Sequence, residues 1–148
     1  MSLTENLNTT MKEAMKAKDS LRLSAIRLVR SAIKNREIEE RRELDDQGVI
    51  GVLSSLAKQR RDSAEAYRQS GREDLAEKEE KELAIIQEFL PRQLSEEELR
   101  ALIDQAVSES GAAGPRDMGK VMKLVTAQTT GRADGRLVSE LVKARLGA

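Results

Sequence analysis

Hydrophobic residues recur at a helical period along almost the whole chain. They follow the spacings i, i+3, i+4, i+7 and i+8, which place a single apolar stripe along a helix. The clearest stripes are Leu99, Leu102, Ile103, Ala106 and Val107, then Ile26, Val29 and Ile33, and then Met118, Val121, Met122 and Val125. The sustained alternation of β-branched and polar residues that is typical of strands is absent. The pattern predicts an all-α protein.

Helix-capping residues divide this pattern into seven segments. Ser95 and Glu98 have the spacing of a capping box, and Leu94 and Leu99 are placed to form its hydrophobic staple. The same spacing occurs at Ser2 and Glu5, single N-caps are predicted at Asp19, Asp117 and Asp134, and left-handed helix ends at Gly71 and Gly147. The predicted helices cover residues 3–18, 20–43, 46–70, 73–90, 96–110, 118–129 and 135–146.

A proline marks the predicted boundary between two domains. Pro91 disfavours a helical conformation at Leu90, so the helix that carries Leu90 must end there. We therefore expect an N-terminal domain of about four helices at residues 1–91 and a small three-helix domain at residues 92–148. Within the second domain, Gly111 to Pro115 predicts a loop.

Composition narrows the classes of function. The 148 residues include 26 basic and 26 acidic side chains, so the net charge is zero and no attraction of the whole chain to nucleic acid or acidic membranes is expected. Tyr67 and Phe89 are the only aromatic residues, and they are expected to pack between helices. Two rings cannot form the aromatic platform on which single-stranded bases stack.

The chain contains no cysteine and no histidine. This excludes disulfides, zinc fingers, cysteine nucleophiles and Ser-His triads, and we expect no catalytic residue, no metal and no cofactor. Glutamates are plentiful near residues 77–88, but di-metal helical bundles combine them with histidines. No signal peptide and no apolar run of about 18 residues is present, so the expectation is a cytoplasmic protein without a membrane anchor.

One segment partly matches a nucleotide-binding motif. Gly114, Gly119 and Lys120 have the spacing of a phosphate-binding loop, but Val121 stands where Ser or Thr would hold Mg²⁺. No predicted strand precedes the segment, and Pro115 removes one backbone donor. A loop followed by a helix start is the favoured interpretation.

Local clusters of basic residues are the remaining candidates for a functional site. Between residues 22 and 36 there are five basic residues and no acidic one, and Arg27, Arg30 and Lys34 share a helical face. From residue 116 to the C-terminus there are seven basic residues and three acidic ones. The candidate RNA-binding residues are Lys120, Lys123, Arg132, Arg136 and Lys143. The alternative is that these charges lie on ordinary solvated helix faces and pair with neighbours.

Several stretches resemble the GatB/YqeY family over essentially the whole chain. They are Lys58 to Tyr67, Gly71 to Glu79, Glu82 to Ser95, Asp117 to Lys123 and Gly131 to Gly135. The family is similar to the tail of the B subunit of the tRNA-dependent amidotransferase, a tail that contacts tRNA while the chemistry takes place in another domain. Similar modules are appended to some glutaminyl-tRNA synthetases. The resemblance also carries the label of a carbon–nitrogen ligase with glutamine as amido donor, which no residue pattern here supports.

The combined expectation is a non-catalytic, tRNA-binding accessory protein linked to tRNA-dependent amidation or aminoacylation. The resemblance implies that Lys120, Lys123, Arg132 and Arg136 face tRNA, and that an aminoacyl-tRNA synthetase or an amidotransferase is the protein partner. The alternative function is a helical protein–protein adaptor without RNA contact. An enzyme that acts alone is the third alternative.

Overall fold

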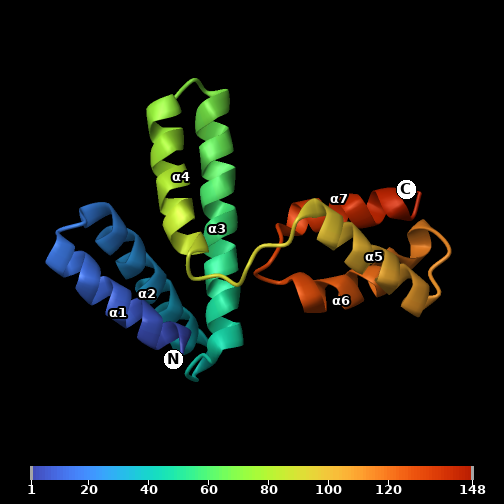
Figure 1. The fold of residues 1–148 in the computed structure, drawn as a ribbon, viewed down its shortest axis with the longest axis horizontal. Helices are drawn as coiled ribbons and strands as arrows, with labels where there is room; N and C mark the ends of the chain where they lie inside the picture. The colour runs from blue at the N-terminus through green and yellow to red at the C-terminus, as the bar shows by residue number, and fades with distance from the viewer. Residues whose placement is uncertain (1, 148) are drawn as a thin grey trace. The chain divides into compact units, whose positions relative to one another are not determined.

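The computed structural model describes residues 2–147 (Figure 1). The helices are α1 (Leu3–Ala17), α2 (Ser20–Glu40), α3 (Asp46–Gln69), α4 (Glu73–Gln87), α5 (Glu96–Ser110), α6 (Met118–Thr129) and α7 (Gly135–Arg145), with a 3₁₀ turn at Pro115–Asp117 before α6. No strand occurs among the described residues. The all-α prediction is confirmed, and all seven predicted helices end within three residues of the observed positions.

Local side-chain caps explain where most helices begin. Ser2 and Ser95 each accept a hydrogen bond from the backbone N–H three residues later, and the glutamate at that position bonds back to the cap, which confirms both capping boxes. Asp19 and Asp134 cap α2 and α7 as predicted. Asp45 caps α3 through the N–H of Gly48, a cap that the sequence analysis did not include.

Two predicted helix ends and one predicted cap were wrong. The predicted end of α4 at residue 90 is three residues too late, because the helix ends at Gln87 and the N–H groups of Phe89 and Leu90 form turn bonds to the carbonyl three residues earlier. The predicted end of α2 at residue 43 is three residues too late, because Arg41 adopts the left-handed conformation (φ 55°) and ends the helix at Glu40. Asp117 stands at the N-cap of α6 but makes no cap hydrogen bond. Its Oδ2 instead accepts the N–H of Ala113 at 2.9 Å, because the preceding 3₁₀ turn directs the carboxylate back towards the loop.

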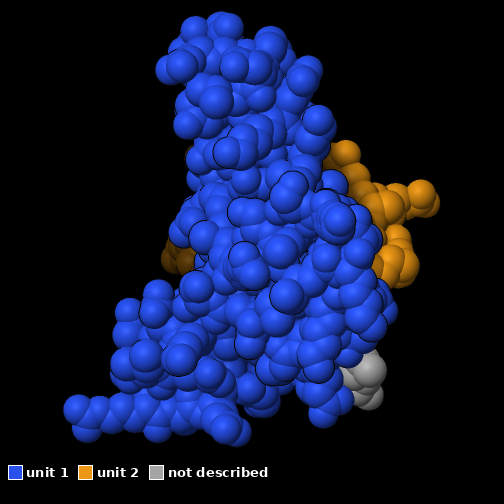
Figure 2. Space-filling model, turned by 90° about the vertical axis from the view of Figure 1, so that its left-hand side faces the viewer, with its two compact units in different colours: residues 1–90 blue, residues 91–148 orange. Residues whose placement is uncertain are grey.

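Contacts divide the chain into two compact units, residues 1–90 and 91–148, which Figure 2 colours separately. In unit 1, α3 and α4 form a long antiparallel hairpin that turns at Gly71 (φ 79°), and α1 and α2 form a second hairpin (Figure 1). The most deeply buried large side chains of its core are Leu7, Ile26, Val29, Val49, Leu53 and Ile86. Phe89 is also buried there, as predicted, whereas Tyr67 is half-buried. Independent folding of the two units stays a prediction.

Unit 2 is a bundle in which α5, α6 and α7 each contact the other two. Its core contains Leu99, Ile103, Val121, Val125 and Val142, all at most 2% exposed. These residues come from the apolar stripes of three different helices, so the amphipathic pattern places one face of each helix inward. The opposite face of each helix is therefore available to ligands.

The segment before α5 is bonded to the turn between α6 and α7. Gln93 Nε2 donates to the carbonyl oxygen of Gly131 at 2.7 Å, and the backbone N–H of Leu94 donates to that of Arg132 at 2.7 Å. Gly131 adopts a left-handed conformation (φ 79°), which favours glycine at this turn. These bonds hold the segment before α5 against the turn between α6 and α7.

Candidate nucleic-acid interface

Lys120 and Lys123 lie on the outer face of α6. With 3.6 residues per turn, Lys123 lies opposite the buried residues Val121 and Val125, and Lys120 lies on the flank next to it, roughly 100° around the helix from Val121. The side chain of Lys120 is 69% exposed, and its Nζ lies 4.0 Å from Asp117 Oδ1, at the outer limit of an ion pair. Lys123 is exposed and forms no ion pair with any carboxylate of the described chain. This helix therefore presents two adjacent cations to solvent.

Arg136 and Lys143 occupy the outer face of α7. Both are exposed, and they stand seven residues apart, opposite the buried Val138 and Val142. Glu140 is exposed on the same face, between them. Its carboxylate lowers the positive potential of this face, so α7 is a weaker anion-binding surface than α6.

The two helices present their basic residues in different directions. In a three-helix bundle, the face opposite the core points outward from each helix, so the outer faces of α6 and α7 diverge. The structure therefore contains two small basic faces in unit 2, one on α6 and one on α7. Contact with both requires a ligand that curves around the bundle.

Arg132 belongs to neither face. It is half-buried in the turn between α6 and α7, and its Nε donates to the carbonyl oxygen of Arg92 at 3.4 Å. Its own carbonyl oxygen accepts the N–H of Leu94. The geometry places Arg132 among the contacts that hold the start of α5 to this turn.

An arginine–glutamate pair marks the same start of unit 2. Arg92 donates two hydrogen bonds to the carboxylate of Glu98, Nη1–Oε1 at 2.9 Å and Nη2–Oε2 at 2.8 Å. This guanidinium, together with the backbone N–H of Ser95, lowers the pKa of Glu98 to about 2. Glu98 therefore stays ionised and keeps the capping box closed well below neutral pH.

Several other arginines are occupied by carboxylates. Arg60 of α3 lies against Glu79 and Glu82 of α4, with Nε to Glu82 Oε2 at 2.8 Å, and all three side chains are less than 20% exposed. Arg68 pairs with Glu73 and Glu80, which lowers the pKa of Glu80. Arg60 and Arg68 thus hold α3 to α4 through ion pairs between the two helices.

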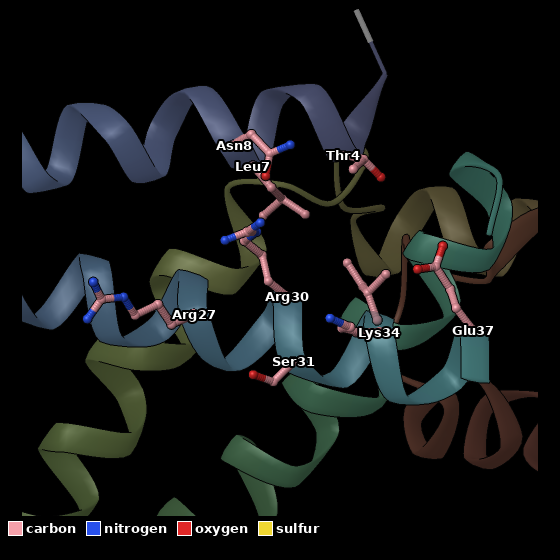
Figure 3. Close-up of a pocket in the computed structure, with 9 residues that line it drawn as sticks. Thr4, Leu7, Asn8, Arg27, Arg30, Ser31, Lys34 and Glu37 are labelled. Atoms are coloured by element: carbon pink, nitrogen blue, oxygen red, sulfur yellow. The ribbon is translucent and has the colours of Figure 1, made fainter. Parts of the chain in front are cut away.

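A polar pocket lies between α1 and α2 in unit 1 (Figure 3). Its volume is about 510 Å³. It is lined by Thr4, Leu7 and Asn8 of α1 and by Arg27, Arg30, Ser31, Ile33, Lys34 and Glu37 of α2. The sequence predicted the shared face of Arg27, Arg30 and Lys34, but not the residues of α1 opposite them, because nothing in local spacing indicates which helix faces this one.

Neither a metal cluster nor a membrane span is visible in the described part of the chain. Residues 2–147 contain no group of three or more Asp, Glu, His or Cys side chains placed to hold a metal ion. In the same range, every helix is too short or too polar to cross a membrane.

Comparison with known proteins identifies the family. The sequence profile described as Yqey-like protein matches residues 4–146. The chain belongs to the YqeY-like family. The family resemblance drawn from the sequence is therefore confirmed.

Curated relatives of this YqeY-like chain are yeast proteins named altered inheritance of mitochondria protein 41, mitochondrial. The one from Lachancea thermotolerans is 34% identical over 140 residues, which cover 90% of this chain and 75% of the relative. The one from Vanderwaltozyma polyspora is 45% identical over 85 residues, 57% of this chain and 46% of the relative. A Saccharomyces cerevisiae relative is 36% identical over 104 residues, 70% of this chain and 55% of the relative. The chain thus spans about half the length of the last two.

These relatives correct the expected cytoplasmic location. Their names describe mitochondrial proteins, which conflicts with an assignment to the cytoplasm alone. The expectation was wrong because the absence of cysteine, of a long apolar run and of a secretory signal does not distinguish one aqueous compartment from another.

Proposed function

We propose that this YqeY-like protein is a non-catalytic accessory protein that binds the backbone of structured RNA, specifically tRNA, and acts beside an enzyme of tRNA-dependent amidation or aminoacylation. The observation that carries the proposal is the basic face of α6, where Lys120 and Lys123 stand exposed to solvent. Cations on a rigid helix neutralise phosphates and release counterions. The scarcity of aromatic residues argues against readout of unstacked bases.

The α7 face supplies the second contact. In this proposal, Arg136 and Lys143 extend the binding surface for an RNA whose backbone curves around unit 2. A folded tRNA has a bent backbone that suits such a surface, and a straight duplex does not. In this proposal Arg132 positions the α6–α7 turn and makes no RNA contact, since its guanidinium bonds to a backbone carbonyl within the unit.

The salt dependence of tRNA binding tests the proposal and counts the faces. Contact by both faces neutralises four phosphates and gives log Kd against log salt a slope magnitude of about 3.6, at roughly 0.9 per phosphate. Contact by α6 alone gives about 1.8. Binding is measured by filter retention or fluorescence anisotropy with labelled tRNA at several salt concentrations, and an unstructured RNA of equal length should bind less tightly.

The decisive variant carries Lys120→Glu, Lys123→Glu, Arg136→Glu and Lys143→Glu. These positions are exposed, so circular dichroism should show an intact fold while tRNA affinity falls steeply. A matched control replaces exposed lysines of unit 1, with the changes Lys12→Glu, Lys16→Glu, Lys58→Glu and Lys81→Glu. It alters net charge equally and should retain most of the affinity. Equal losses in the two variants, or full affinity in the first, would contradict the proposal.

A helical protein–protein adaptor is the second candidate function. It is favoured by large apolar side chains that unit 1 exposes: Met15 at 51%, Leu28 at 39% and Ile38 at 65%. If the wild-type protein binds no tRNA even at low salt, the RNA proposal fails and the adaptor becomes the better interpretation.

A further inference from the structure

The pocket between α1 and α2 is lined by an unusual concentration of cations. Arg27, Arg30 and Lys34 follow one another at i, i+3 and i+7 on α2 and all line the pocket. Figure 3 shows Asn8 and Thr4 on α1 across from them, with the guanidinium of Arg30 reaching towards α1. Like charges at i, i+3 and i, i+4 destabilise a helix only modestly per pair, so an anion bound between them would be stabilising.

No carboxylate of the described chain supplies that anion. Arg27 and Lys34 form no ion pair within residues 2–147, and the Nη1 of Arg30 contacts only the uncharged Sδ of Met11, at 3.1 Å. By contrast, Arg22 at the start of the same helix contacts two carboxylates, those of Asp19 and Glu88.

Asn8 and Glu37 are among the other polar side chains that line the pocket. The Oδ1 of Asn8 is buried and has no hydrogen-bond partner among the described residues; as an acceptor it suits a hydroxyl or a bridging water, whereas a phosphoryl oxygen is left to the cations of α2. Glu37, the only acidic residue that lines the pocket, accepts the N–H of Leu44 at 2.9 Å through Oε2, which ties its carboxylate to the loop after α2. Three cations and one carboxylate leave the pocket with a net charge of +2.

The dimensions of the pocket indicate the kind of anion. At 1.5 Å per residue, the backbones of Arg27 and Lys34 are separated by about 10 Å along the axis of α2, so the three cations are spread along the pocket and suit a ligand with several anionic groups. A volume of about 510 Å³ lies within the range of small-molecule sites. We propose that Arg27, Arg30 and Lys34 form a binding site for a small ligand that carries two or more phosphoryl groups.

A small ligand fits this recess better than an RNA backbone does. The lysines of α6 stand exposed on the outside of unit 2, where an RNA backbone can reach them. In the pocket, the cations are opposed by α1, and the lining ends at the buried Leu7 and Ile33. The proposal is independent of RNA binding by unit 2, whose residues it does not involve.

Calorimetric titration of the full-length protein with sodium tripolyphosphate tests the proposal. The variant carries Arg27→Gln, Arg30→Gln and Lys34→Gln, and we expect its affinity to fall at least about tenfold, because each lost guanidinium or ammonium removes a charge-assisted hydrogen bond. The control carries Lys16→Gln, Lys58→Gln and Lys81→Gln, which removes the same charge from exposed positions outside the pocket, and its affinity should change less than about twofold.

Thermal unfolding supplies a second readout that separates ligand loss from misfolding. Without ligand, the pocket variant should melt at the same temperature as the wild type or slightly higher, because like-charge repulsion on α2 is relieved. Tripolyphosphate should raise the melting temperature of the wild type and of the control, but not that of the pocket variant.

Further titrations distinguish the sources of the phosphoryl groups and the outcomes that overturn the proposal. ATP binding more tightly than tripolyphosphate identifies a nucleotide, equal affinities identify an inorganic polyphosphate, and both support the site. No binding of either probe by the wild type, equal loss in pocket and control variants, or orthophosphate binding as tightly as tripolyphosphate would overturn it. The proposal would also be overturned, in favour of an RNA site, if tRNA displaced tripolyphosphate from the wild type and the pocket variant no longer bound tRNA.

Discussion

Replacing Ile86 of α4 by alanine should destabilise unit 1 and leave unit 2 unchanged. Ile86 is 0% exposed and belongs to the core that α2, α3 and α4 share. The surrounding helices are too long and too firmly packed to collapse into the space left by the lost carbons. The free energy of unfolding of unit 1 should therefore fall by about 3 kcal/mol, within the usual range of roughly 2–5 kcal/mol for such a change.

Amide hydrogen exchange resolves this effect by unit. A loss of about 3 kcal/mol accelerates exchange at the most protected amides of unit 1 roughly a hundredfold. For a unit of this size it also lowers the melting temperature by ~12–24 °C. Leu99→Ala in unit 2 is the reciprocal variant, since Leu99 is 1% exposed in the other core.

Ile38→Ala provides the matched control. Ile38 is 65% exposed on α2, so its truncation should change stability by less than about 0.5 kcal/mol. If Ile86→Ala accelerates exchange equally in both units, the chain folds as one cooperative unit and the two-domain prediction is wrong. If it accelerates exchange in neither, the assignment of Ile86 to the core is wrong.

Three further predictions concern the start of unit 2. Arg92 is the main reason why the pKa of Glu98 is lowered from 4.5 to about 2, so the ionised Glu98 should stabilise the protein above pH 4.5. This contribution should disappear as the pH falls towards 2. Glu98→Gln should abolish that part of the pH dependence in urea unfolding. Ser95→Ala should lower stability by about 1 kcal/mol, measured by thermal unfolding, because the N-terminal N–H groups of α5 lose their cap. Gln93→Ala should cost about 1–3 kcal/mol in the same assay, because the buried Gly131 loses the donor to its carbonyl oxygen; an unchanged melting temperature would contradict this.

Local hydrogen bonds were predictable where donor and acceptor are close in sequence and the acceptor has one donor within reach. Both capping boxes join residues three positions apart, and the apolar stripes that form the two cores follow from helical period alone. Asp117 shows the limit of this reasoning. By spacing alone, its carboxylate could accept a hydrogen bond either from the first turn of α6 or from the preceding loop. The 3₁₀ turn at Pro115–Asp117 directs it towards the N–H of Ala113 in that loop.

The candidate sites could be predicted from the sequence only where their residues lie on one helix. Helical spacing alone predicted the cationic face of Arg27, Arg30 and Lys34. The neighbouring helix that makes this face a pocket, and brings the unpartnered Asn8 to it, emerges only when α1 packs on α2. The expectation of a cytoplasmic protein failed for a different reason, because exposed polar residues do not distinguish one aqueous compartment from another.

By itself, the amino-acid sequence determined the helices, most of their caps and the inward face of each helix, because these depend on hydrogen bonds between near neighbours and on the burial of apolar stripes. The family followed from the sequence motifs. The tertiary structure decided which helices meet and what each charged residue faces. Packing separated the basic residues of α6 from those of α7 and placed Arg132 in a backbone contact. It paired Arg60 with carboxylates of another helix and left Arg27 and Lys34 without ion pairs in the described chain. The reason is that burial of the apolar faces fixes where the helices lie, and these positions then determine which charged groups come into contact.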